Sequence, residues 1–136
     1  MGQLNPAFVY IFGNFRYRLP TVTDWELSAN CGLDLDLYLY WIVALQSSKQ
    51  VPYANLRLLP DAEDLPNFLV PIRTYPTNGK GFYNLIGNVA EMTATPYTAK
   101  GGSWYHTADQ SQVRGTVAYT EPTAWLGFRC ICEVGL

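Results

Sequence analysis

The sequence has little charge, few cysteines and no long hydrophobic run. The low charge argues against a nucleic-acid-binding protein, and the lack of a long hydrophobic run argues against a membrane-spanning protein. Its 136 residues include nine Lys or Arg and eleven Asp or Glu, which gives a net charge of -2. Such a chain has no basic face that could displace counterions from phosphates, so we expect no nucleic-acid partner. No apolar run approaches the roughly 20 residues that cross a bilayer, so we expect no membrane span.

The N-terminus lacks a basic segment followed by an apolar run and a small-residue cleavage site, so we expect no signal peptide in this chain. Hydrophobic residues make up 49% of the chain and aromatic residues 15%. A chain of this length and composition is enough for one domain with a real core. We therefore interpret residues 1–136 as a single domain.

Cysteine is scarce, with only Cys31, Cys130 and Cys132. The last two lie two positions apart, so in a strand they point to the same face and cannot easily bond to each other. We favour buried free thiols that act as small hydrophobic side chains, with a disulfide framework as the alternative.

The clearest local signal is a helix start. Thr21 is a good N-cap, and Asp24 completes a capping box at the head of a helix that runs to about Ala29. Val22, Trp25 and Ala29 fall on one face of that helix at 3.6-residue spacing. We also expect a short apolar helix over 6–12, a strand over 33–39, a hairpin within 37–58 and a strand over 127–133.

Short motifs follow one another in a fixed order along the chain. They are Arg18–Thr21 (RLPT), Asp24–Glu26 (DWE), Gly87–Glu91 (GNVAE), Gly101–Trp104 (GGSW) and Gly127–Cys130 (GFRC). In order and spacing this set resembles the formylglycine-generating-enzyme-like, or sulfatase-modifying-factor, domain. That family is a variant of the C-type-lectin fold.

The resemblance covers roughly residues 16–30 and 75–133 and implies an α+β fold of the C-type-lectin-like type. Family members have a further N-terminal half, so the resemblance implies a domain shortened at the N-terminus. Three explanations stay open: a fragment, a reduced form, or half of a larger assembly.

Active members of the family carry two redox cysteines shortly after the Gly-Gly-Ser motif, and those positions here are His106 and Ser111. The family oxidation needs a thiolate to bind copper(I), because soft sulfur suits that metal. The resemblance therefore implies no copper, no enzymatic activity and a pseudoenzyme. Similar domains without these cysteines occur in gliding-motility and type IX secretion lipoproteins of Bacteroidetes-like bacteria, which implies an extracytoplasmic or outer-membrane-associated location. A hydrolytic triad of Ser111, His106 and Asp109 is the weaker alternative to an exposed, inert His106.

The resemblance also implies calcium, a hard ion that takes oxygen ligands. The ligands would be the Asn84 side chain, the carbonyls of Gly87 and Val89, and Glu91. The alternative is that Gly87 and Asn88 form a plain hairpin turn. A second, weaker calcium site would use Asn55, Leu56, Asp64 and Pro66, with Asp61 as a substitute ligand, against the alternative of solvated loop acids.

Trp25, Glu26, Trp104 and Arg129 are interpreted as structural residues, with Glu26 as the expected partner of a buried Arg129. Exposed aromatic side chains give large contact area at low entropic cost, which suits recognition. We accordingly expect a small-molecule or glycan ligand to contact Tyr105, His106 and Tyr119.

The leading functional hypothesis is a non-catalytic binding or scaffolding module, stabilised by calcium, in a larger cell-surface or secretion-related assembly. The alternatives are a sulfatase-modifying-factor domain with altered chemistry and a retroelement-diversified ligand-binding protein. A helix that is apolar on all sides is not stable in water. We therefore expect a protein partner or a second copy to cover the segment 6–12.

Overall fold

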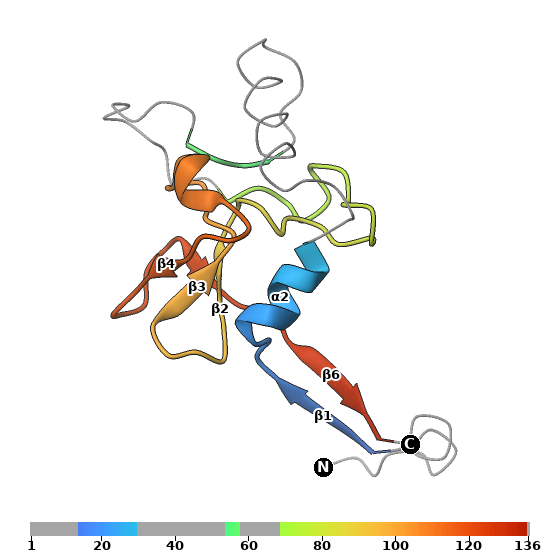
Figure 1. Cartoon of the computed structure of the whole chain (residues 1–136). Helices are drawn as coiled ribbons and strands as arrows, with labels where there is room; N and C mark the ends of the chain where they lie inside the picture. Colours follow the sequence, from blue (N-terminus) through green and yellow to red (C-terminus); the bar gives the residue numbers. More distant parts are fainter. Residues whose placement is uncertain (1–13, 30–53, 58–68, 136) are drawn as a thin grey trace.

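The computed structural model describes residues 14–29, 54–57 and 69–135, which form two small sheets and one α-helix (Figure 1). The expected helix over 6–12, the strand over 33–39, most of the hairpin within 37–58, and the residues Cys31, Asp61, Asp64 and Pro66 lie outside these ranges. The elements are β1 Phe15–Arg18, α2 Val22–Ala29, β2 Ala90–Met92, β3 Thr98–Lys100, the 3-10 turn η1 Asp109–Ser111, β4 Val117–Ala118, β5 Leu126–Gly127 and β6 Ile131–Val134.

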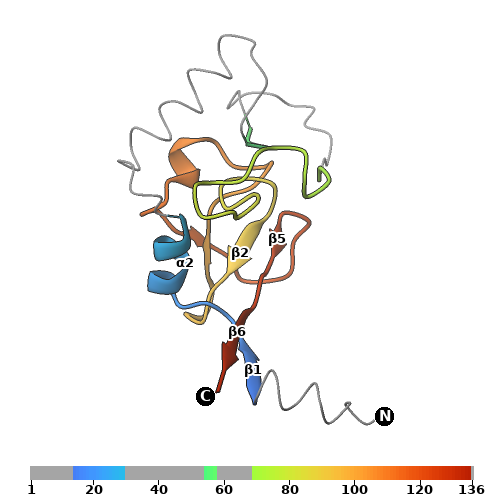
Figure 2. The same cartoon turned by 90° about the vertical axis from the view of Figure 1, so that its right-hand side faces the viewer.

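The larger sheet has four strands in the order β4-β3-β2-β5. β2 runs antiparallel to β3 and parallel to β5, so the GNVAE and GFRC motifs lie on neighbouring strands. Helix α2 lies beside this sheet, and its residues Trp25 and Ala29 pack with Leu85, Ile86 and Val113 in the main core (Figure 2). The core thus lies beside the turn that precedes β2.

The second sheet is a two-stranded ribbon of β1 and β6 that extends away from the four-stranded sheet (Figures 1 and 2). Arg16 and Arg18 both bond to Glu133 across the ribbon, at 3.0 and 2.5 Å. Arg18 also bonds to Asp24 at 2.8 Å, which ties the ribbon to the start of α2.

The start of α2 confirms the predicted capping box. The Thr21 hydroxyl accepts a hydrogen bond from the Asp24 backbone N–H at 3.1 Å, and the Asp24 carboxylate accepts one from the Thr21 N–H at 3.0 Å. These two bonds satisfy N–H groups that a helix start leaves without partners. No helix in the described ranges is long and apolar enough to span a bilayer.

Two expectations for the C-terminal segment are wrong. The expected strand over 127–133 is divided, because β5 pairs with β2 in the larger sheet whereas β6 pairs with β1 in the ribbon. Cys130 and Cys132 are free and exposed rather than buried. The ribbon is only two strands wide, and no described residue buries these thiols.

Candidate functional site

The loop after β3 closes tightly on itself at its glycines. Gly101 and Gly102 have φ angles of 87° and 64°, a left-handed conformation that glycine adopts without strain. A Cβ on Gly102 would stand 1.9 Å from the Ser111 hydroxyl, so Ser111 packs directly against this glycine. Ser111 is fully buried and donates to the Thr107 carbonyl at 2.7 Å.

His106 is buried, with 6% of its surface exposed, so the expectation of an exposed histidine is wrong. Its Nδ1 lies 2.7 Å from the Ser103 hydroxyl, and its ring meets Trp125 edge-on with centroids 4.7 Å apart. Burial lowers the pKa of His106 below its ordinary value, which favours the neutral ring at pH 7. The physical cause of its burial is this hydrogen bond together with the indole contact.

The alternative triad is not assembled. Ser111 bonds to a backbone carbonyl, His106 bonds to Ser103, and Asp109 is exposed. In the part of the chain that the structure describes, no carboxylate is bonded to His106, and no group of three or more His, Cys, Asp or Glu side chains could hold a metal. A hydrolase needs a reachable nucleophile and an oriented base, and this loop offers neither.

The outer side of the loop carries an aromatic face, defined here as Trp104, Tyr105 and Trp125. Tyr105 is 47% exposed and lies nearly parallel to Trp125, with centroids 6.4 Å apart. The Arg57 guanidinium lies over the Tyr105 ring at 5.8 Å. The indole N–H of Trp104 is buried and has no hydrogen-bond partner among the described residues.

Of the three expected ligand contacts, only His106 is buried. Tyr105 is exposed, His106 is buried beneath it, and Tyr119 packs against Tyr97 with ring centroids 6.1 Å apart. Trp125 is partly buried: it packs against the core cluster of Ala90, Ala99 and Val117 and stacks on Tyr105.

The expected calcium ligand Glu91 is already bonded on both oxygens. Arg129 donates to it through three hydrogen bonds of 2.6 to 2.9 Å, and the Trp25 indole N–H donates at 2.9 Å. Burial raises the pKa of Glu91, and the hydrogen bonds from Arg129 and Trp25 oppose that rise. Glu26 pairs with Lys100 instead, at 2.8 Å, so its expected pairing with Arg129 is wrong.

These contacts bear on the fit of calcium. Three N–H groups reach this carboxylate, two from Arg129 and one from Trp25, and because the Nε–H of Arg129 is shared between the two oxygens, each oxygen has two contacts. As Glu91 is placed, it offers no free oxygen to an ion, so calcium at Asn84, Gly87, Val89 and Glu91 would have to displace Arg129. The plain-hairpin alternative fails as well, because β2 pairs antiparallel with the later strand β3 and the described residues directly before the Gly87 turn form no strand.

The expected second calcium site is only partly described. The Asn55 side chain donates to the Asn88 side chain at 3.2 Å, and Leu56 is a core residue. Asp64 and Pro66 lie outside the described ranges. The second site therefore stays a prediction.

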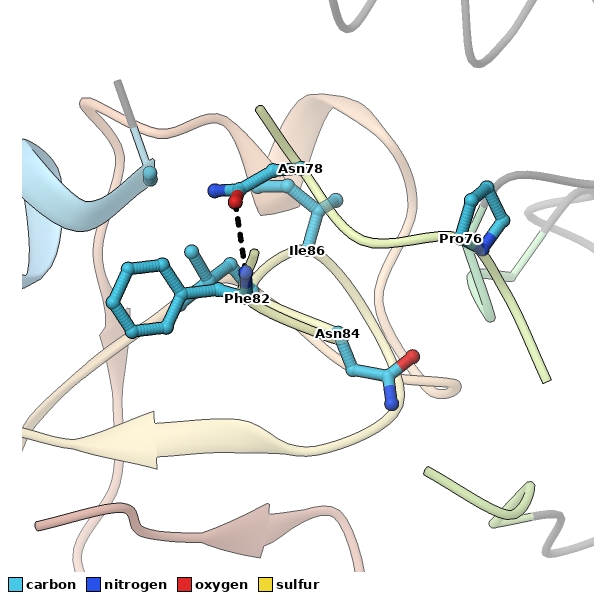
Figure 3. Close-up of a pocket in the computed structure, with 7 residues that line it drawn as sticks. Pro76, Asn78, Phe82, Asn84 and Ile86 are labelled. Carbon is cyan, nitrogen blue, oxygen red and sulfur yellow. Dashed lines mark hydrogen bonds between the residues drawn. The ribbon is translucent and has the colours of Figure 1, made fainter. Parts of the chain in front are cut away.

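Phe82 and Asn84 line two separate pockets. The smaller, of about 20 Å³, has room for a single water, and its Asn78 carboxamide accepts a hydrogen bond from the Phe82 N–H at 3.0 Å (Figure 3). The larger pocket, of about 420 Å³, opens beside Arg129 and Phe128.

Comparison with known proteins decides the family. Residues 3–134 match the sulfatase-modifying factor enzyme 1-like domain. The chain belongs to this family. It is 34% identical over 135 residues to inactive C-alpha-formylglycine-generating enzyme 2 of Bos taurus, covering 87% of this chain and 44% of that protein. It is 37% identical over 86 residues to the formylglycine-generating enzyme of Mus musculus, covering 60% of this chain and 23% of that protein. The chain thus spans less than half the length of these curated relatives.

Solved structures confirm the predicted formylglycine-generating-enzyme-like fold. Treponema denticola variable protein 1 superposes with a TM-score of 0.62 at 21% identity, covering 91% of this chain and 50% of that one. CarF superposes with a TM-score of 0.58 at 22% identity, covering 87% and 47%. Likeness at this identity shows the fold alone. The relatives include two that are named inactive and two that are named formylglycine-generating enzyme, so family membership does not decide activity.

Sequence reasoning missed one buried group of this family member. Lys100, which directly precedes the Gly-Gly-Ser motif, is fully buried. Its ammonium donates to Glu26 and to the carbonyls of Val113 and Gly115 at 2.6 to 2.8 Å, and it lies 5.4 Å from the Trp25 ring. Nothing in the sequence signals this burial, because neighbouring strand residues point to opposite faces and lysine is usually exposed.

Proposed function

We propose that this chain is a non-catalytic binding module on a formylglycine-generating-enzyme-like fold. The observation that supports the proposal is the closed loop around Ser103, His106 and Ser111. The positions that the family resemblance gives to the two thiols hold buried side chains that are bonded within the loop. A relative named inactive, 34% identical over 87% of this chain, supports the same reading.

The enzymatic alternative is a family domain with altered chemistry, and the relatives named formylglycine-generating enzyme favour it. Against it, the hydroxyls of Ser103 and Ser111 are fully buried and cannot reach a substrate. The test is oxidation of a cysteine-containing sulfatase peptide with copper(I) and oxygen, with an active formylglycine-generating enzyme as positive control. We expect no aldehyde above background, and turnover would contradict the proposal.

The binding part of the proposal concerns the aromatic face. Tyr105 is exposed, and the unpaired indole N–H of Trp104 is a donor that a ligand could satisfy after a small side-chain movement. Flat rings with a donor beside them suit the faces of sugar rings or extended peptides. Glycan and peptide arrays, followed by titration of each binder, test this directly. Tyr105→Ala should abolish binding, whereas Tyr17→Ala, which removes a still more exposed tyrosine from the ribbon, should leave it unchanged.

The proposal has three further parts: the chain acts as a scaffold in a larger assembly, a partner or a second copy covers residues 6–12, and the protein has an extracytoplasmic location. Light scattering at micromolar concentration tests association, and a stable monomer would count against it. We propose calcium at the Glu91 site only if the ion displaces Arg129 from Glu91. The retroelement-diversified alternative requires a template repeat in the neighbouring DNA, and the likeness to the Treponema denticola protein concerns the fold alone.

A further inference from the structure

A pocket of about 420 Å³ lies on the molecule at the junction of the turn before β2 and the segment after β5. Small-molecule sites in proteins are typically roughly 300–1,000 Å³. The pocket is lined by Ile72, Gly81, Phe82, Tyr83, Asn84, Asn88, Val89, Glu91, Phe128 and Arg129, none of which belongs to the aromatic face around Tyr105.

The cation in this pocket is held in place before any ligand arrives. The Nε and Nη2 atoms of Arg129 donate to Glu91, and Nη2 also donates to the Tyr83 carbonyl at 2.8 Å. The Nη1 atom donates to no residue in the described part of the chain, and one third of the side chain is exposed. A guanidinium fixed on one edge thus presents its other edge to the pocket, at little further entropic cost.

The anion beside it is not available to a ligand. Glu91 is only 3% exposed, and its oxygens are occupied by Arg129 and Trp25. A ligand in the pocket therefore meets a hydrogen-bond donor and not an acceptor at the charged end.

Apart from Tyr83, Asn84 and Asn88, the remaining side chains of the wall are apolar. Phe82, Phe128 and Ile72 line the pocket and are 36%, 62% and 68% exposed, which is high for large apolar side chains gathered at one place. Val89 adds a further apolar contact on the strand side. Exposed apolar side chains around a few fixed polar groups are typical of ligand sites.

From this arrangement we propose that the pocket binds a monocarboxylate with a flat apolar body, such as an aryl-alkanoic acid or the C-terminal aromatic residue of a peptide. The carboxylate accepts from Nη1 of Arg129, and the apolar body lies between Phe82 and Phe128. A charge-assisted hydrogen bond is roughly twice as strong as a neutral one, so the acid binds better than its amide. A phosphate would need more cations than this pocket contains, and Arg129 repels a cationic ligand.

Calorimetry on the full chain tests the proposal with 3-phenylpropionate and its neutral amide, 3-phenylpropanamide, as probes. We expect the acid to bind and the amide to bind about tenfold more weakly, the loss of one charge-assisted bond. A peptide that ends in phenylalanine, with a free or an amidated C-terminus, tells a peptide ligand from a free acid. Equal binding of acid and amide, or no binding of either free acid or free C-terminus at about 5 mM, overturns the proposal.

Variants locate the binding without disturbing the ion pair. Phe128→Ala removes an exposed ring and should weaken binding of 3-phenylpropionate about tenfold, whereas the matched Phe15→Ala on the ribbon should not change it. Acid binding that is unaffected by Phe128→Ala also overturns the proposal. The sulfatase-peptide assay and the Tyr105→Ala titration remain independent of this pocket, so failure here is distinguishable from failure of the proposed function.

Discussion

Arg129 and Glu91 form a two-pronged ion pair whose three hydrogen bonds measure 2.6 to 2.9 Å. Glu91 lies on β2, and Arg129 lies in the segment where the chain leaves the larger sheet for the ribbon. Trp25 of α2 donates to the same carboxylate. One buried acid therefore joins the helix, the sheet and the C-terminal segment.

Arg129→Met should destabilise the fold by about 3–5 kcal/mol, because the buried carboxylate loses its compensating charge. Urea unfolding measures this, and Arg114→Met, at an exposed arginine, is the control with an expected change near zero. A loss no greater than that of Arg114→Met would show that the pair contributes nothing to stability.

The same variant should show a defined pH dependence. Burial raises the pKa of Glu91 above 4.5, and without Arg129 it rises further. The folded state then holds a proton that the unfolded state releases, so the free energy of unfolding falls as pH rises above about 4.5. The deficit relative to wild type should be larger at pH 8 than at pH 5.

Calcium binding should be limited by Arg129. In the wild-type protein we expect a chelator to change the melting temperature little, because the guanidinium already neutralises Glu91. Arg129→Gln frees the carboxylate, and calcium at a hundredfold excess over Kd should then stabilise that variant by about 2.7 kcal/mol. Adding Glu91→Gln should remove the response. A wild-type melting temperature that falls by several degrees with chelator would show that an ion holds Glu91 instead.

The features that could be predicted from the sequence were local patterns and short motifs in a recognisable order. The capping box of Thr21 and Asp24 depends on residues three apart, and the family motifs carry their own order and spacing. The partner of Arg129 was not readable, because Glu26 and Glu91 are both acids and only the fold decides which one reaches it.

The burial of His106 could not be predicted from the sequence either, because it depends on how the loop folds. A single histidine in a polar loop looks exposed, yet Gly102 lets the loop fold back until Ser111 touches it, and His106 goes beneath. The alternation of side chains also does not reveal that the last strand is divided. The alternation continues through the segment, although the paired strand changes from β2 to β1.

Asp24 should titrate with a pKa of about 2, below its ordinary 3.8, chiefly because Arg18 bonds to it and secondly because Thr21 does. A lowered pKa contributes stability above pH 3.8 that is lost as pH falls towards 2. NMR titration of the carboxyl carbon measures this. Arg18→Gln should raise the pKa part of the way back, since Thr21 still bonds, whereas Arg16→Gln should leave Asp24 unchanged. An unshifted Asp24 in the wild type would contradict the ion pair.

Cys130 and Cys132 should both react with iodoacetamide in the native state, because both are exposed and free. Mass spectrometry of the intact protein counts the adducts, and peptide mapping assigns them. Cys132→Ser should lose one adduct without a change in unfolding. Protection of both thiols in the native state would show that something covers the outer face of the ribbon, such as a partner or a second copy.

Gly101→Ala should be far more damaging than Gly81→Ala, although the two glycines have φ angles of 87° and 85°. The shared backbone strain costs about 1–2 kcal/mol in either variant. A Cβ at Gly101 would also stand 2.2 Å from the Leu85 carbonyl oxygen and 2.9 Å from the Trp25 ring, whereas nothing lies within 4 Å of one at Gly81. Since a backbone carbonyl cannot move aside as a side chain can, the extra loss in Gly101→Ala measures how tightly the Gly-Gly-Ser loop packs on the core. Urea unfolding of both variants gives that difference, and equal losses would mean that the loop can shift away from Leu85 at no cost.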